Sequence, residues 1–98
     1  MRTMLKISIP IEAGNQGIKD GSLTKAVDAT SKELQPESSY FYAEDGKRTA
    51  LFVFDMKDSS QIPAIAEPMW MKLKAEVSII PVMNAQDLKS GLGKVARA

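Results

Sequence analysis

Cysteine and histidine are both absent from the 98-residue sequence. Without cysteine the chain has no disulfide, no thiolate metal site and no cysteine nucleophile. Without histidine it also lacks the commonest general base and the commonest metal ligand. The sequence contains no Gly-rich phosphate loop, metal-ligand cluster or nucleophile elbow. We therefore expect no cofactor and no metal site. The sequence also contains no recognisable catalytic motif, so it leaves open whether the protein is an enzyme.

An excess of charge of one sign and long apolar runs are also lacking. The 13 Lys and Arg residues balance 12 Asp and Glu residues, which leaves a net charge of +1. Such a balance argues against a nucleic-acid or membrane surface. No apolar run approaches the roughly 18 residues of a membrane span, and the first residues show no secretory signal pattern. We therefore expect a cytoplasmic protein with no nucleic-acid or membrane partner.

The length and composition indicate one domain. Hydrophobic residues make up 44% of the chain and charged residues 26%, which is ordinary for a globular protein. A chain of this size buries about 60–65% of its unfolded surface, enough for one modest core. We expect a single domain over residues 1–98, with its core in residues 3–83 and a C-terminal helix in residues 84–98.

The firmest local pattern lies in residues 39–55, where Asp45-Gly46 separates two runs rich in aromatic and β-branched residues. A two-residue type I′ turn needs φ > 0 at both central positions, which Asp tolerates and Gly prefers. The turn predicts a hairpin in which Glu44 faces Lys47 and Tyr40 faces Leu51. Alternation then predicts a mixed face of Tyr40, Tyr42, Thr49, Leu51, Val53 and Asp55. The other, nearly all apolar face should meet the helices and carries Phe41, Ala43, Ala50, Phe52 and Phe54.

Apolar periodicity predicts the remaining elements. Residues 3–11 alternate as a half-buried strand that residues 12–15 interrupt, with Asn15 as a helix N-cap. Helical spacing follows to Leu34, with a weak point at Gly21. These segments precede the hairpin.

A second helical stripe follows the hairpin and consists of Ile62, Ile65, Ala66, Met69 and Trp70. Pro68 lies inside this stripe and should kink or shorten the helix. A last strand is expected over residues 75–83, where Pro81 indicates an edge position or the end of pairing. Asn84 is a candidate cap for the C-terminal helix, with Asp87 three residues later.

This order, β-α-β-β-α-β with an extra C-terminal helix, predicts an α+β fold of the ferredoxin-like type with a four-stranded antiparallel sheet. Both main helices then cover one sheet face. The open face is expected to carry Lys6, Ser8, Tyr40, Tyr42, Thr49, Leu51, Val53, Ser78 and Ile80. We expect a homodimer formed through this face, because no element of so short a chain is clearly free to cover it. The C-terminal helix is the rival cover.

At this level the chain resembles the dimeric α/β-barrel superfamily, whose small ferredoxin-like units pack their open sheet faces together. Members include muconolactone isomerases, cofactor-free monooxygenases of the antibiotic-biosynthesis type and many uncharacterised proteins. Residues 46–88, GKRTALFVFDMKDSSQIPAIAEPMWMKLKAEVSIIPVMNAQDL, also resemble an uncharacterised bacterial family of that group. The resemblance implies a dimeric α/β barrel. Several enzymes of the superfamily use a histidine, which this sequence lacks.

Five residues are candidate ligand-binding groups. Tyr40 and Tyr42 would line a cavity with their phenols, or pack in an interface with their hydroxyls in water. Lys6 and Ser8 share that face, where a desolvated Lys loses its proton more readily; the alternative is an ammonium that stays hydrated. Trp70 would shape a pocket mouth, or belong to the core.

Three further charged groups are candidates for a role in a site. Asp55 is a weak candidate for a general base, or else caps the turn into the helix that follows. Glu67 would be the acidic group of a pocket at the Pro-interrupted helix. Arg48, beside Lys47, would take an anion, or both would form a solvated hairpin tip.

Two functions from different classes follow. The first is a homodimeric small-ligand-binding or structural protein, in which Tyr40, Tyr42 and Trp70 sequester a small, partly apolar ligand. The alternative is a cofactor-independent isomerase or monooxygenase acting on a small, partly apolar organic substrate, with Asp55, Glu67 or a tyrosine handling the proton. A closed cavity that holds a carboxylate or Lys beside a phenol would favour the enzyme.

Overall fold

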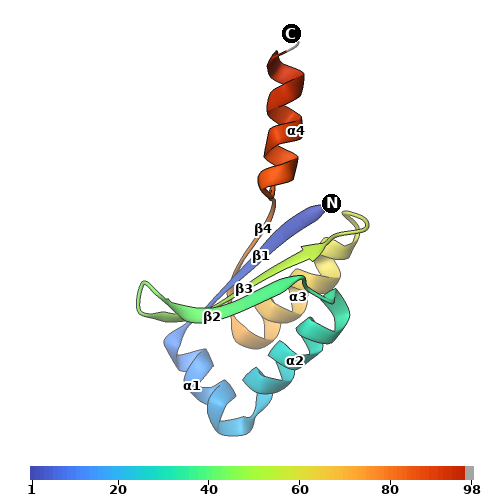
Figure 1. The fold of residues 1–98 in the computed structure, drawn as a ribbon. Helices are drawn as coiled ribbons and strands as arrows, with labels where there is room; N and C mark the ends of the chain where they lie inside the picture. Colours follow the sequence, from blue (N-terminus) through green and yellow to red (C-terminus); the bar gives the residue numbers. More distant parts are fainter. Residues whose placement is uncertain (97–98) are drawn as a thin grey trace.

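The computed structural model of the protein describes residues 1–96, which form a four-stranded antiparallel sheet with three helices on one face (Figure 1). The elements in chain order are β1 (Arg2–Ile9), α1 (Ile11–Asp20), α2 (Ser22–Leu34), β2 (Ser38–Glu44), β3 (Lys47–Asp55), α3 (Gln61–Leu73), β4 (Glu76–Pro81) and α4 (Ala85–Ala96). The strand order β2-β3-β1-β4, with α1 and α2 together in place of the first helix, is a ferredoxin-like arrangement, as predicted. Every helix within residues 1–96 is too short or too polar to cross a bilayer.

The β2–β3 hairpin has the predicted turn and register. Asp45 and Gly46 have φ values of 53° and 74°, so both central positions are left-handed, as a type I′ turn requires. Glu44 pairs with Lys47 and Tyr40 pairs with Leu51. The hairpin therefore assigns the side chains of both strands to the predicted faces of the sheet.

The hydrophobic core lies between the sheet and the helices α1, α2 and α3. Strand β1 alternates strictly between buried and half-buried residues along its length. Leu5 and Phe52 have no exposed surface and Phe54 is 1% exposed. The helices contribute the buried residues Leu23, Leu34, Ile65, Met69 and Leu73. Because this core is shared by one sheet face and three helices, the opposite sheet face takes no part in it.

The prediction for residues 10–15 is wrong. Strand β1 ends at Ile9, and residues 12–15 belong to α1 instead of a break, so Asn15 is not its N-cap. Pro10 ends the strand because it has no N–H to donate, and it stands at the N-cap of α1. The Gly14 N–H donates to the Pro10 carbonyl at 2.9 Å and closes the first helical turn. A left-handed Gly21, with φ of 80°, separates α1 from α2, at the predicted weak point.

Helix α3 differs from its predicted stripe at one residue. It runs without interruption past Pro68, and its buried residues are Ile65, Ala66, Met69 and Leu73. Trp70 is exposed, because it lies on the side of α3 that points away from the sheet. Strand β4 is an edge strand that ends at Pro81, as the proline indicates.

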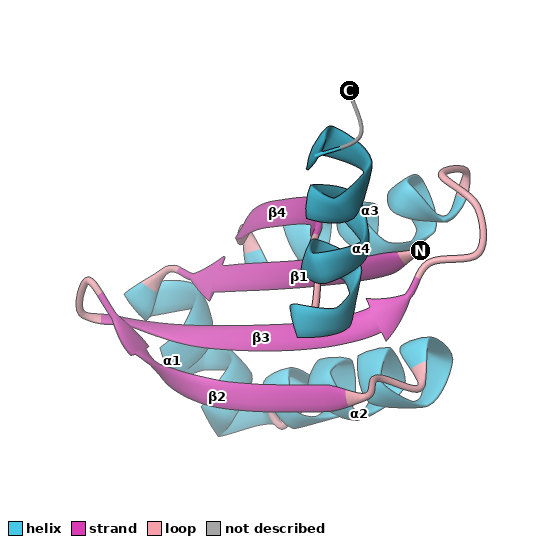
Figure 2. Cartoon of the chain, turned by 45° about the horizontal axis from the view of Figure 1, so that its top comes forward, coloured by secondary structure: helices cyan, strands magenta, loops and turns pink. Residues whose placement is uncertain are grey.

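Helix α4 stands away from the body on the side of the open sheet face and does not cover that face (Figures 1 and 2). Its start is a reciprocal capping box: the Asp87 N–H donates to Asn84 Oδ1 at 2.8 Å, and the Asn84 N–H donates to Asp87 Oδ2 at 3.1 Å. Every residue from 85 to 95 is exposed. The last two residues of the predicted helix, 97–98, lie outside the described residues. The rival cover for the open face is thus excluded within the described chain.

Phe41 and Phe52 contact each other edge-to-face, with ring centroids 5.8 Å apart. Because only Phe52 is fully buried, truncating the two side chains should lower the free energy of unfolding by different amounts. Phe52→Ala removes a fully buried ring, so we expect the free energy of unfolding to fall by about 3–5 kcal/mol. Phe41→Ala removes a ring that is 57% exposed, and we expect a loss of about 1 kcal/mol. Urea denaturation measures both, and equal losses would contradict the assignment of Phe52 to the core.

Candidate functional site

The open sheet face is the first candidate site, and the strand register arranges its side chains in rows across the sheet. One row is formed by Tyr40, Leu51, Lys6 and Ser78. A second row is formed by Tyr42, Thr49, Ser8 and Glu76, and a third by Ser38, Val53, Met4 and Ile80. All nine residues predicted for this face belong to these rows. The middle of the face is apolar, and its polar groups gather at the two ends, one of which is the hairpin end.

Three side chains form a hydrogen-bonded cluster at that end. The Lys6 ammonium donates to Glu44 Oε2, across 38 positions of sequence, and forms an ion pair with it. The Tyr42 hydroxyl donates to the other carboxylate oxygen, Glu44 Oε1, at 2.9 Å. Glu44 therefore holds both Lys6 and Tyr42. Sequence patterns predict Lys6 and Tyr42 as site residues but not Glu44, because only strand pairing brings Glu44 to Lys6.

The cluster keeps each group in its ordinary charge state. The hydrogen bond to Glu44 raises the pKa of Lys6 and also raises the pKa of Tyr42. The bonds from Lys6 and then Tyr42 lower the pKa of Glu44. All three shifts move away from neutrality, whereas a general acid or base works best with a pKa near the working pH. This geometry fits binding and positioning better than proton transfer.

A shallow hollow of about 260 Å³ adjoins the cluster on the same face. Ser8 and Ser78 line it together with Lys6, Glu44 and Glu76. Its lining is therefore mostly polar, and it is open on the side away from the sheet. The structure brings three of the five predicted binding residues, Lys6, Ser8 and Tyr42, to this corner. Tyr40 lies on the same face one row away.

The other end of the open face is polar and internally neutralised. Arg2 donates to Glu37 Oε1 at 2.7 Å and to Asp87 Oδ2 at 2.5 Å, so it ties the start of α4 to the sheet. Asp55 accepts hydrogen bonds from the Lys57 ammonium and the Met1 amine, both at 2.5 Å. These cations, Lys57 first, lower the pKa of Asp55 to about 2. Asp55 is then a weak base at neutral pH, and its bonds do not cap α3.

Trp70 and Glu67 lie in the helix layer, both on α3 and both exposed. The sheet separates them from Tyr40 and Tyr42. The structure therefore does not bring Trp70 and the two tyrosines together in one cavity of the described chain.

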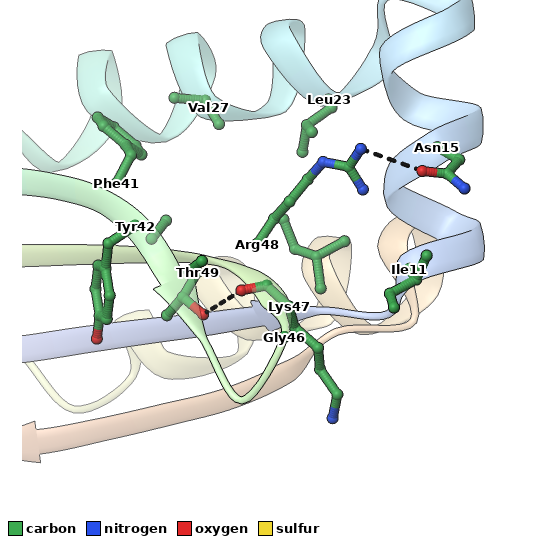
Figure 3. A pocket seen from close by; sticks show the side chains of 13 residues that line it. Ile11, Asn15, Leu23, Val27, Phe41, Tyr42, Gly46, Lys47, Arg48 and Thr49 are labelled. Carbon is green, nitrogen blue, oxygen red and sulfur yellow. Dashed lines mark hydrogen bonds between the residues drawn. The ribbon is translucent and has the colours of Figure 1, made fainter.

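A larger groove, of about 600 Å³, lies on the helix side of the hairpin and was missed by the sequence analysis (Figure 3). Its walls come from the β2–β3 hairpin, from α1 and from α2. Figure 3 shows Phe41 pointing toward Val27 of α2 and Tyr42 pointing the other way. The groove exists because the hairpin extends beyond the helices that cover the rest of the sheet. Only the apolar character of Phe41 hinted at it.

Arg48 and Lys47 lie on opposite sides of the hairpin. The Arg48 guanidinium points into the groove and donates to Asn15 Oδ1 at 3.1 Å (Figure 3). Lys47 points to the other side, where its Nζ lies 3.7 Å from Glu76 Oε2. The two cations therefore do not form one anion site.

The fold and the open face define a small α+β protein of ferredoxin-like arrangement. No known family model matches the chain, and a search of curated proteins finds no match. Within residues 1–96, no three or more acidic side chains gather in a way that could hold a metal ion. The function must therefore be argued from the two surfaces described above.

The cluster predicts a shift in the titration of Tyr42. In Glu44→Gln the phenol keeps a neighbour but loses the negative charge that disfavours tyrosinate. We expect the pKa of Tyr42 to fall in this variant. Absorbance of tyrosinate during an alkaline titration measures it, with Tyr40→Phe as the background in both proteins so that one phenol is observed. An unchanged or higher midpoint would contradict the hydrogen bond to Glu44.

Proposed function

We propose that the protein acts as a homodimer that pairs its open sheet faces, in a small-ligand-binding or structural role and not as an enzyme. One observation carries this proposal: three helices cover one face of the sheet, and no element of the described chain covers the other. That face has Leu51, Val53 and Met4 half-buried and Tyr40 and Ile80 exposed. Apolar and aromatic groups in water are what association would bury.

The distribution of charge supports the same proposal. The apolar middle of the face lies between two polar ends, which is the usual anatomy of a protein interface. The charged groups at those ends are already paired: Lys6 with Glu44, and Arg2 with Glu37 and Asp87. A second copy could therefore cover the face without burying an unpaired charge, which is the main cost of such contacts.

Helix α4 provides a second argument for a partner. It is 12 residues long, near the lower limit for a stable isolated helix. Gly91 and Gly93 each cost it up to about 1 kcal/mol of helix propensity. Its stripe of Leu88, Leu92 and Val95 is exposed. Because α4 rises on the side of the open face, a copy packed on that face would meet this stripe and could stabilise the helix.

The enzyme alternative has weaker support. A carboxylate and a Lys do lie within hydrogen-bond reach of a phenol, at Glu44, Lys6 and Tyr42. Their hollow is open in the single chain, and the pKa shifts lead away from neutrality. A binding role is compatible with the charge states that Lys6, Glu44 and Tyr42 already have.

A charge placed in the middle of the open face should abolish the dimer. We expect the wild-type protein to stay dimeric to low micromolar concentration and Leu51→Lys to be a folded monomer, because a lysine there would be buried without a partner. Light scattering after size exclusion, over a dilution series, measures the mass. Ile18→Lys adds the same charge on exposed α1 and should remain dimeric. A monomeric wild-type protein, or a Leu51→Lys dimer, would reject the proposed interface.

The same dimer should depend on one side of α4. Leu92→Asp places a charge in the apolar stripe, and we expect a weaker dimer and a loss of helical circular dichroism. Ser90→Asp introduces the same residue about 160° around the helix from Leu92 and should change neither signal. If the two variants behave alike, α4 makes no specific contact with the second copy.

A further inference from the structure

We propose that the groove between the hairpin and helices α1 and α2 binds a small amphiphile that has a carboxylate head and an apolar tail, with Arg48 as the group that binds the carboxylate. This groove lies on the helix side of the hairpin, opposite the proposed dimer interface (Figure 3); Tyr42 and Thr49 of the open face reach its lining, and all its walls come from one chain. The inference therefore holds or fails independently of the dimer.

The groove has the size and the walls of a small-molecule site. Its volume is about 600 Å³, within the range of about 300–1,000 Å³ that is usual for ligand pockets. Leu23, Val27, Phe41 and Ala50 give it an apolar lining. Phe41 belongs to the apolar side of β2, yet 57% of it is exposed. An apolar tail lying on this ring would remove from water a surface that the fold leaves uncovered.

Arg48 brings a positive charge to this apolar groove. Its described polar contact is with a neutral group, Asn15 Oδ1, at 3.1 Å. The ion pairs found within residues 1–96 join other cations to carboxylates and leave Arg48 without an acidic partner. A guanidinium has five N–H donors, so most of its donors stay available to a ligand.

The position of the guanidinium is constrained by α1. A Cβ added at Gly14 would lie only 2.6 Å from Arg48 Nη1, so the helix backbone is in close contact with the guanidinium. The neighbouring residues Gly14 and Asn15 of α1 both lie against the guanidinium, and a side chain restricted in this way loses less conformational entropy when it binds a ligand.

The single positive charge of the groove favours a carboxylate as the head group of the ligand. One guanidinium matches one carboxylate, which it can bind through two parallel N–H donors. The nearby Lys47 points away toward Glu76 (Figure 3), so a second cation for a doubly charged phosphate is not provided. Apolar walls on the α2 side and a single cation on the α1 side then define a ligand with one charged end.

The test is a titration of the ¹⁵N-labelled protein with octanoate, followed by backbone amide chemical shifts. We expect saturable shifts confined to the hairpin, α1 and α2. Octanol keeps the tail without the charge and acetate keeps the charge without the tail, and both should bind more weakly than octanoate. Arg48→Gln should weaken octanoate binding by about tenfold or more, since a charged hydrogen-bonded pair is lost.

Two control variants make the result specific. Lys32→Gln removes a cation from an exposed position of α2 that does not line the groove and should leave octanoate binding unchanged. Arg48→Lys keeps the charge without the planar fork and should give an intermediate affinity. The proposal is overturned if octanoate does not bind, if the shifts map to the open sheet face, or if Arg48→Gln and Lys32→Gln lose the same affinity. The spectrum of each variant without ligand shows that it is folded.

Discussion

The register of the β2–β3 hairpin is the constraint on which most of this structure depends. The type I′ turn at Asp45 and Gly46 sets β3 against β2, and β3 in turn pairs with β1. A slip of one residue would exchange Phe52 and Phe54 for Leu51 and Val53 in the core, because side chains alternate between faces. If β2 were the strand that shifted, Tyr40 and Tyr42 would lie under the helices instead. A turn of two residues thus determines both the core and the composition of the open face.

A sheet covered on one side only has consequences for the whole chain. Helices α1, α2 and α3 pack on the face that carries Leu5 and Phe52, and α4 leaves the body on the opposite side. The molecule is elongated as a result, measuring 55 × 28 × 18 Å along its principal axes. Helix α4 stands on the side of the open face (Figures 1 and 2). Arg2 joins the sheet to this helix, since it forms an ion pair with Asp87 at the start of α4.

Alternation along the hairpin also separates two kinds of chemistry. Lys47 and Arg48 are neighbours in sequence, but one belongs to the acidic edge near Glu76 and the other to the apolar groove near α1. On the open face, Lys6, Glu44 and Tyr42 neutralise one another. In the groove, Arg48 has a neutral partner and a closely packed glycine. The two faces of the hairpin therefore differ in what they could bind: a second protein surface on one, a small anion with an apolar tail on the other.

Local patterns determined much of this protein by themselves. The turn at Asp45 and Gly46, the two faces of the hairpin, the edge position of β4 and the capping box at Asn84 follow from short-range rules of backbone conformation and alternation, and the structure confirms them. Only the tertiary structure decided the helical state of residues 12–15, the exposure of Trp70, the pairing of Lys6 with Glu44 and the groove at Arg48. The physical reason is distance along the chain: each of these features depends on which remote element packs nearby, and a local pattern does not contain that information.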